Sequence, residues 1–305
     1  MLYLDNMLLR DIPTFINLGV NVALSKIPYY PIIITFDVTN KCTLRCKHCY
    51  WWLQEHDREL DDDTFFNKVV ELKKRHPSLI QAVWLGGEPL LRPKLIERCK
   101  TLFSLNRVIT NGTLPLPLWK DVRFICSVDG TKEYHELQRG KNTYEKIKKN
   151  INRSDLNINL FCVVTKLNYT CLEAYVDEWS KTKVRSVGFG FYTPIKGKNN
   201  DELWLDFKER DIVIERIIKL KKQYPKFINS SLSLLNNFRS ANCQVTTERC
   251  RRDYSAFNGM CFDAYLVRKF PCVIGEDADC TKCGCVVSTL GELIRHGDKT
   301  VLLEQ

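Results

Sequence analysis

Residues 42–50 read Cys-Thr-Leu-Arg-Cys-Lys-His-Cys-Tyr, and they come shortly after the run Pro-Ile-Ile-Ile-Thr-Phe-Asp-Val at 31–38. This run is mostly apolar and rich in β-branched residues, which predicts a strand buried on both faces. The loop after it carries three cysteines, with three and then two residues between them. Three thiolates on one short loop can converge on one inorganic centre, and sulfur ligands favour zinc, copper(I) or an iron–sulfur cluster.

The number of cysteines in the loop helps to distinguish between these kinds of metal centre. A structural zinc site is normally closed by four ligands, whereas a [4Fe–4S] cluster held by three cysteines leaves one iron open. No second CxxC or HxxxH pair follows at zinc-finger spacing. His48 could be a fourth zinc ligand, but its ring would have to fold back on the loop. The loop therefore favours a cluster, with zinc as the alternative.

The following chain predicts strands that alternate with helices. Beyond 31–38, the predicted strands are 80–85, 107–109, 122–126, 156–164 and 185–191, and the main predicted helices are 61–75, 93–105, 171–183 and 206–224. The chemically unusual residues follow the carboxyl ends of the strands, which is where parallel βα units place ligand sites. The pattern predicts an α/β fold, either doubly wound or a barrel.

A glycine-rich turn, Gly86-Gly87-Glu88-Pro89, follows the second predicted strand. Two glycines allow the backbone to bend sharply and to approach a ligand closely. The carboxylate of Glu88 can accept a hydrogen bond from an ammonium group. The alternative is an ordinary turn closed by a capping glutamate.

The CxxxCxxC loop followed by an aromatic residue resembles the cluster-binding loop of the radical S-adenosylmethionine (radical SAM) enzymes, and the GGEP turn resembles their GGE motif. The resemblance implies a partial (βα)6 barrel with a [4Fe–4S] cluster on Cys42, Cys46 and Cys49, and with SAM at the open iron. It also implies reductive cleavage of SAM to a 5′-deoxyadenosyl radical that attacks an unactivated C–H or C=C bond. An electron donor such as ferredoxin or flavodoxin would be a partner.

The same resemblance implies a SAM site at the strand ends. Glu88 would orient the SAM amino group, Asn111 would face the ribose, and Ser127 and Arg139 would hold the ribose or the methionine carboxylate, which an Arg fork suits. Val164 and Tyr192 would line the adenine site, although packing in the protein core accounts for these two residues equally well. The candidate SAM-site residues are His48, Tyr50, Gly86, Gly87, Glu88, Asn111, Ser127, Arg139, Val164 and Tyr192.

A second group of cysteines lies near the C-terminus. Its spacing resembles the shortened, SPASM/twitch-type extensions of some radical SAM enzymes, but it lacks two cysteine pairs of the fuller extension. It could hold a second [4Fe–4S] cluster, with zinc as the alternative. The candidate ligands are four of Cys261, Cys272, Cys280, Cys283 and Cys285. The other cysteines in predicted helices and strands, Cys99, Cys126, Cys162 and Cys171, are interpreted as core residues.

Composition places the chain among globular proteins, because its 305 residues are 44% hydrophobic and 27% charged. Fourteen cysteines without a signal peptide predict a reducing, cytoplasmic location. No apolar run reaches the roughly 18 residues of a membrane span. The formal net charge of +10 suits an anionic partner. Because the lysines are spread along helices, the simpler interpretation is a solvated basic surface, and nucleic acid is not favoured.

We expect four segments: an N-terminal amphipathic helix in 1–29, a barrel core over 30–195, a helical segment over 196–240 that packs on the barrel, and a cysteine-rich extension over 241–305. The first helix and the positive charge suggest an isoprenoid or membrane-lipid substrate with peripheral membrane contact, and the layout resembles the hopanoid-lipid members of the family. The alternative is a peptide or protein substrate. A zinc-dependent nucleic-acid-binding protein is the non-enzyme alternative.

Overall fold

The computed structural model describes residues 31–153, 155–198, 201–253 and 259–286. Its centre is an eight-stranded sheet in the order β6-β5-β4-β3-β2-β1-β7-β8. Neighbouring strands run parallel except for the last pair, β7 and β8. The strands are β1 Ile33–Asp37, β2 Gln81–Leu85, β3 Leu105–Thr110, β4 Val122–Ser127, β5 Asn157–Val164, β6 Ser186–Phe191, β7 Gly259–Phe262 and β8 Arg268–Lys269.

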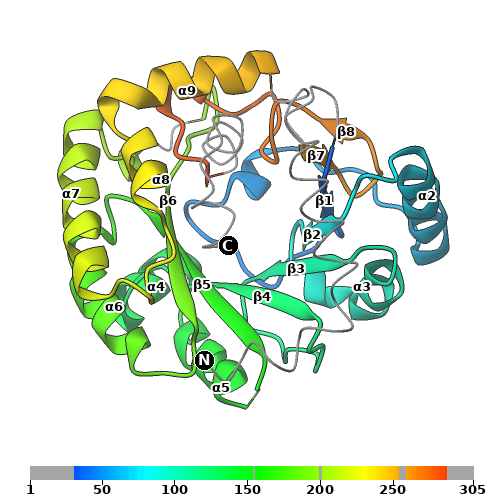
Figure 1. Cartoon of the computed structure of the whole chain (residues 1–305), viewed down its shortest axis with the longest axis horizontal. Helices are drawn as coiled ribbons and strands as arrows, with labels where there is room; N and C mark the ends of the chain where they lie inside the picture. The colour runs from blue at the N-terminus through cyan, green and yellow to red at the C-terminus, as the bar shows by residue number, and fades with distance from the viewer. Residues whose placement is uncertain (1–30, 154, 199–200, 254–258, 287–305) are drawn as a thin grey trace.

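Helices cover the outer face of this curved sheet (Figure 1). They are α2 Asp62–Arg75, α3 Pro93–Lys100, α4 Lys132–Arg139, α5 Thr143–Asn152, α6 Leu172–Ser180, α7 Phe207–Gln223, α8 Leu232–Asn237 and α9 Ser240–Asp253. Short 3-10 turns cover Tyr50–Leu53, Pro89–Leu91, Tyr169–Cys171, Asp201–Leu203 and Cys280–Lys282. The predicted partial (βα)6 barrel with a cysteine-rich C-terminal region is confirmed.

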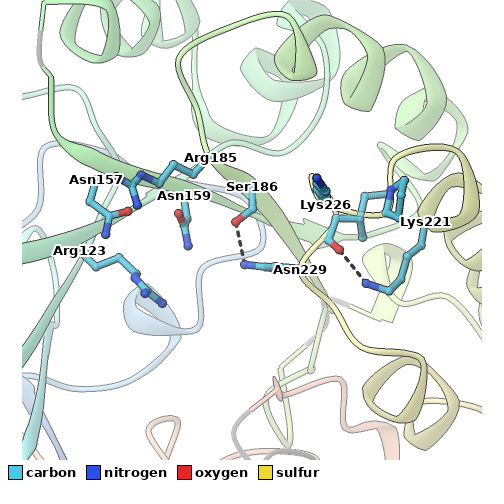
Figure 2. A pocket seen from close by; sticks show the side chains of 10 residues that line it. Arg123, Asn157, Asn159, Arg185, Ser186, Lys221, Lys226 and Asn229 are labelled. Carbon is cyan, nitrogen blue, oxygen red and sulfur yellow. Dashed lines mark hydrogen bonds between the residues drawn. The ribbon is translucent and has the colours of Figure 1, made fainter. Parts of the chain in front are cut away.

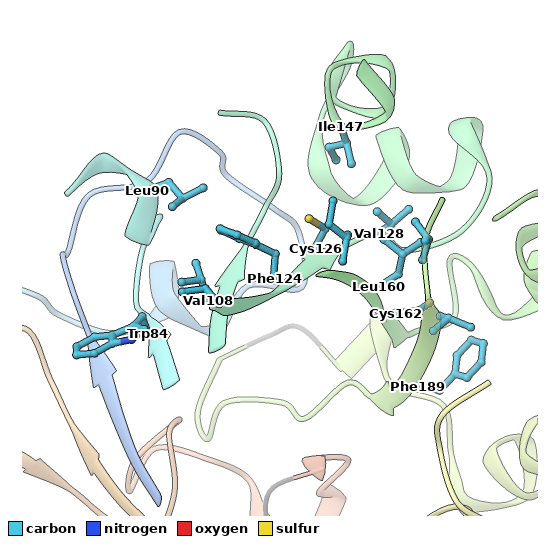
Figure 3. Close-up of a cluster of buried hydrophobic side chains, with 14 of the residues drawn as sticks. Trp84, Leu90, Val108, Phe124, Cys126, Val128, Ile147, Leu160, Cys162 and Phe189 are labelled. Carbon is cyan, nitrogen blue, oxygen red and sulfur yellow. The ribbon is translucent and has the colours of Figure 1, made fainter. Parts of the chain in front are cut away.

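The core lies between the sheet and the helices because side chains alternate along each strand. In β4, Val122, Phe124 and Cys126 are buried, whereas Arg123 and Ile125, which alternate with them, are only half-buried. Figure 3 shows one apolar side chain after another reaching this core from successive strands. The interpretation of Cys99, Cys126, Cys162 and Cys171 as core residues is confirmed by their burial.

Helix boundaries follow local capping. The Asp61 side chain accepts hydrogen bonds from the backbone N–H groups of Asp63 and Thr64, which sets the start of α2 where the sequence predicted it. The next helix, α3, is shorter than predicted. It ends at Lys100 because Leu105 already donates its N–H to the carbonyl of Ile80, 2.9 Å away, and so begins β3.

The cysteine-rich extension contains more regular structure than the sequence indicated. Its strand β7 pairs in parallel with β1, with Phe262 opposite Phe36, and the two rings stack with centroids 6.1 Å apart. The extension therefore continues the barrel sheet beyond β1.

The helical segment after the barrel packs through one face of α7, where Val213, Ile214 and Ile217 are buried while Ile212 is 64% exposed. The predicted helix at 11–26 lies outside the described residues. The four-segment division remains a prediction. Within the described ranges, no helix is long and apolar enough to cross a membrane.

Candidate active site

Backbone hydrogen bonds hold the segment that leads into the thiol loop, residues 42–49, against the glycine turn after β2. Gly87 donates its N–H to the carbonyl of Thr39 at 2.8 Å, and Glu88 donates to the carbonyl of Lys41 at 2.8 Å. A Cβ atom on Gly87 would lie 2.1 Å from the Lys41 carbonyl oxygen, which is shorter than any van der Waals contact. Glycine is required here because the two loops touch backbone to backbone.

The Glu88 carboxylate joins the ends of β2 and β3. Its Oε1 accepts from the Thr110 hydroxyl at 2.7 Å and from the Leu90 N–H at 3.0 Å, and its Oε2 accepts from the Asn111 N–H at 2.9 Å. Burial raises the pKa of Glu88, and these donors oppose the rise. Glu88 therefore organises the turn after β3, a task the sequence did not predict, and Thr110 was missed with it.

Asn111 connects this turn to the thiol loop. Its Nδ2 donates to the Thr43 hydroxyl at 3.0 Å and lies 3.8 Å from Cys42 Sγ, a weak hydrogen-bond contact. Its Oδ1 accepts from the Thr113 N–H at 2.9 Å, which holds the amide in this orientation. One amide donor is thus aimed at the first cysteine of the loop.

A buried ion pair stands on the other side of the loop. Asp129, fully buried after β4, accepts from Arg139 Nε at 2.5 Å through Oδ2, and from the Val163 N–H at 2.9 Å through Oδ1. Arg139 Nη1 lies 4.0 Å from Cys46 Sγ. Burial disfavours both charges, but their mutual attraction prevails, raising the pKa of Arg139 and lowering that of Asp129.

Asp129 is a site residue that the sequence interpretation missed. It stands in the Ser-Val-Asp-Gly turn at 127–130, where an aspartate is expected for turn geometry alone. Its partner Arg139 follows ten residues later at the end of α4. Only the contact between them identifies Asp129 as the group that orients Arg139 towards the thiol loop.

His48 lies within this ion-pair network. Its Nε2 is 3.4 Å from both Asp129 Oδ2 and Arg139 Nη2, and burial lowers its pKa to about 4. Among the residues that the structure describes, no three His, Cys, Asp or Glu side chains are gathered tightly enough for a single metal ion.

The donor set of the loop suits a cluster. A cubane cluster bonds each thiolate to a different iron, so its thiolates stand further apart than the ligands of one zinc ion. The three thiols are half-buried. Burial raises the pKa of Cys46 to about 12, and Arg139 opposes this rise. Bound metal deprotonates thiols, and the Asn111 and Arg139 donors lie beside two of the sulfurs to support their negative charge.

The remaining predicted residues differ in exposure. Ser127, half-buried, ends β4 on the same strand edge as the loop. Val164 and Tyr192 are buried, and Tyr192 donates its N–H to the Val164 carbonyl at 3.0 Å. Their burial favours core packing over a wall for adenine. Tyr50 packs against a small apolar cluster formed by Ile195 and, from the extension, Cys272, Ile274 and Ala278.

The second group of cysteines is brought together around the extension. Cys250 of α9 packs with Cys261 of β7. Burial raises the pKa of Cys250, and four nearby thiols raise it further. These thiols are Cys272, Cys283, Cys280 and Cys261. Cys250 therefore joins the five predicted candidates.

A buried arginine lies beside this group. The Arg210 Nη1 donates to the Cys283 carbonyl at 2.6 Å and lies 3.7 Å from Cys243 Sγ. Burial lowers the pKa of Arg210, and the thiols of Cys243 and Cys283 counter that effect. Cys243, one of the two helical thiols of α9, was not among the predicted residues.

Comparison with known proteins gives the family. Residues 36–177 match the family model of the Radical SAM superfamily. Fe-coproporphyrin III synthase of Methanosarcina barkeri is 24% identical over 216 residues, which cover 63% of this chain and 53% of that protein. The cysteine-type anaerobic sulfatase-maturating enzyme of Clostridium perfringens is 27% identical over 153 residues, 41% of either chain.

The fold resembles that of a solved structure over nearly all of this chain. Streptococcus suis SuiB bound to precursor peptide SuiA superposes with a TM-score of 0.62 at 17% identity, and covers 96% of this chain and 72% of that one. The chain spans about half the length, or less, of the two curated relatives. Residues 36–177 therefore match the radical SAM superfamily, whose cofactors are a [4Fe–4S] cluster and S-adenosylmethionine.

Proposed function

We propose that this protein is a radical SAM enzyme whose cluster is held by Cys42, Cys46 and Cys49. The observation that carries the proposal is the placement of these thiols at the carboxyl edge of the barrel with polar donors from two further elements beside them. When bound, the cluster and SAM would supply an electron and a 5′-deoxyadenosyl radical that attacks a C–H or C=C bond of the substrate.

The chain's own residues bind and orient. Asn111 and Arg139 point N–H groups at two of the cysteine sulfurs that would bind the cluster. Hydrogen bonds to such sulfurs influence the reduction potential of a cluster. Asp129 keeps Arg139 in place. The Gly86–Glu88 turn holds the loop against the sheet, and its backbone is the proposed contact for the SAM amino group. The electron donor is proposed to be of ferredoxin or flavodoxin type.

The test is product formation by anaerobically reconstituted protein given dithionite and SAM. We expect 5′-deoxyadenosine from the wild type and none from Cys46→Ala. Cys99→Ala is the control, because it removes a fully buried thiol from α3 and leaves the loop untouched. Loss of product in both variants, or in neither, would contradict the assignment of the loop.

For the substrate we propose a peptide or protein. The similarity to SuiB, solved with a precursor peptide, extends through the cysteine-rich extension, and the Clostridium relative is named as a sulfatase-maturating enzyme. The membrane-lipid alternative rests on the positive charge and on residues 11–26, which lie outside the described ranges. Stimulation of SAM cleavage by a precursor peptide encoded beside the gene supports the peptide. Co-sedimentation with liposomes that depends on lipid composition supports the lipid.

We further propose that four of the six grouped thiols hold a second [4Fe–4S] cluster. They are Cys250, Cys261, Cys272, Cys280, Cys283 and Cys285. Two clusters require about eight iron atoms per chain, and the triple variant Cys280→Ala/Cys283→Ala/Cys285→Ala, which keeps only three of the six thiols, should retain about four. One zinc and four irons per wild-type chain would assign the second group to zinc instead.

A further inference from the structure

A pocket of about 350 Å³ lies at the amino ends of β4, β5 and β6, at the edge of the sheet opposite the thiol loop. Arg123 is the second residue of β4, Asn157 the first of β5 and Ser186 the first of β6. Because strands rise about 3.3 Å per residue, the pocket stands roughly 15 Å from the carboxyl edge. It is therefore separate from the proposed SAM site.

The lining of this pocket carries charge of one sign. Four cationic side chains contribute to it, Arg123, Arg185, Lys221 and Lys226, and no acidic residue is among the described residues that line it. Within those ranges Arg123, Arg185 and Lys226 have no carboxylate partner. Burial lowers the pKa of Arg123, and the positive charge of Arg185 lowers it further. The empty pocket thus gathers charges that repel one another.

A further cationic side chain lies on the neighbouring strand β3. Arg107 of β3 stands directly opposite Arg123 in the sheet register, and burial together with Arg123 lowers its pKa to about 10. Concentrated like charge destabilises a compact fold unless an anion neutralises it.

The shape of the pocket indicates the kind of anion. Figure 2 shows Arg123 and Arg185 towards one side and Lys221 and Lys226 towards the other, with amide side chains between them. The Asn157 Oδ1 atom is buried without a hydrogen-bond partner among the described residues, so the pocket also offers an acceptor for a hydroxyl or water. Its volume is at the small end of the range for ligand sites, roughly 300–1,000 Å³.

We propose that this pocket binds a small anion with two linked phosphate groups. An arginine fork matches phosphate oxygens in a bidentate manner, and lysine acts as a point charge for the second group. Because the cations stand on two separated sides of the pocket, a ligand with two anionic groups fits better than a ligand with one. The inference is independent of the proposed function, because it uses none of the residues of the thiol loop or the SAM site.

The test is isothermal titration calorimetry of inorganic pyrophosphate into reconstituted holoenzyme with SAM present, at about 0.15 M salt, so that the SAM site is already occupied. We expect one pyrophosphate per chain, bound at least tenfold more tightly than orthophosphate or malonate. The Arg123→Gln/Arg185→Gln variant should bind pyrophosphate at least tenfold more weakly. Lys226→Gln changes an exposed residue, cannot disturb the core, and should also weaken binding.

The matched control is Lys68→Gln/Lys149→Gln, which removes two positive charges from exposed positions on α2 and α5. We expect its affinity for pyrophosphate to equal that of the wild type. Equal weakening in this control would reduce the effect to general surface charge and overturn the site. Absence of pyrophosphate binding, or affinity unchanged in both pocket variants, would also overturn it. Malonate binding as tight as that of pyrophosphate would overturn the phosphate assignment.

Discussion

The two edges of the barrel sheet arrange charged side chains in opposite ways. At the carboxyl edge, Arg139 is paired with Asp129, Lys269 reaches Asp37 at 2.8 Å, and the Glu88 carboxylate accepts three hydrogen bonds. At the amino edge, Arg123 and Arg185 share a pocket without a carboxylate within the described ranges. Buried charges are stable when paired and hydrogen-bonded. The charges of the carboxyl edge are therefore paired within the protein, whereas those of the amino edge need a bound anion to be neutralised.

The largest effect should come from Gly87→Ala at the carboxyl edge. Its new Cβ meets the backbone of Lys41 and cannot be accommodated by a side-chain movement, so the thiol loop must separate from the turn. We expect destabilisation on the order of 3 kcal/mol or more and loss of most cluster iron. Chemical denaturation and iron analysis measure the two effects.

Gly197→Ala provides the control for this prediction. Gly197 has a φ of 68° and open space around its position, so alanine adds backbone strain without a clash. Its expected cost is about 1–2 kcal/mol, with cluster iron retained. Retention of iron by Gly87→Ala would mean that the close contact of the two backbones does not position the loop.

Breaking the buried ion pair should be the next largest effect. Asp129→Asn leaves the Arg139 guanidinium buried without its counter-charge, and we expect a loss of about 3–5 kcal/mol in the free energy of unfolding. The matched change Asp121→Asn breaks an exposed pair with Lys100 and should cost about 1 kcal/mol or less. Similar losses for the two variants in urea unfolding would contradict the contrast between buried and exposed pairs.

The carboxyl edge should also be sensitive to acid. His135 Nδ1 accepts from the Asp129 N–H at 3.2 Å, and burial, assisted by Arg139, lowers the pKa of His135 to about 3. Below the pKa of about 6.5 for histidine in the unfolded chain, His135 binds a proton in the unfolded state but stays neutral in the folded state. Stability is therefore lost as pH falls, by about 2 kcal/mol between pH 6.5 and pH 4.5.

His135→Asn keeps an acceptor at this position but does not titrate, so it isolates this contribution from that of other groups. The variant should be less stable than the wild type at pH 7, and the difference should narrow on acidification. A difference in urea midpoint that stays constant from pH 7 to pH 4.5 would show that His135 does not titrate in the way inferred.

The smallest effect is expected at the amino edge, with the opposite sign. Arg123→Gln removes one of the mutually repelling cations, so the protein without added anion should gain on the order of 0.5 kcal/mol. Thermal unfolding in phosphate-free buffer measures the change. A clear loss of stability would mean that Arg123 is already compensated and would remove the contrast between the edges.

Local sequence signals predicted the barrel well because they act over a few residues. The capping Asp61 and the β-branched run before the thiol loop placed α2 and β1 within two residues of their observed limits. The pairing of β7 with β1 was not predicted, because it joins a four-residue strand to one more than two hundred residues earlier. Such a pairing leaves no local pattern.

The candidate site was predictable where motifs are contiguous, as in the thiol loop and the glycine turn. Asp129 and Thr110 were missed because each occupies an ordinary turn or strand end, and only tertiary contacts reveal their partners. The basic pocket was missed for the same reason. Its two arginines are far apart in sequence and meet only because β4 and β6 flank β5.

The central claim is that the thiol loop carries a [4Fe–4S] cluster with one iron open to SAM. The most direct measurement is electron paramagnetic resonance of the dithionite-reduced Cys280→Ala/Cys283→Ala/Cys285→Ala variant, in which the loop should hold the remaining cluster, recorded with and without SAM. The account predicts the signal of a reduced [4Fe–4S] cluster whose g-values shift when SAM is added. A spectrum that SAM leaves unchanged, or a loop that binds zinc and gives no signal, would contradict it.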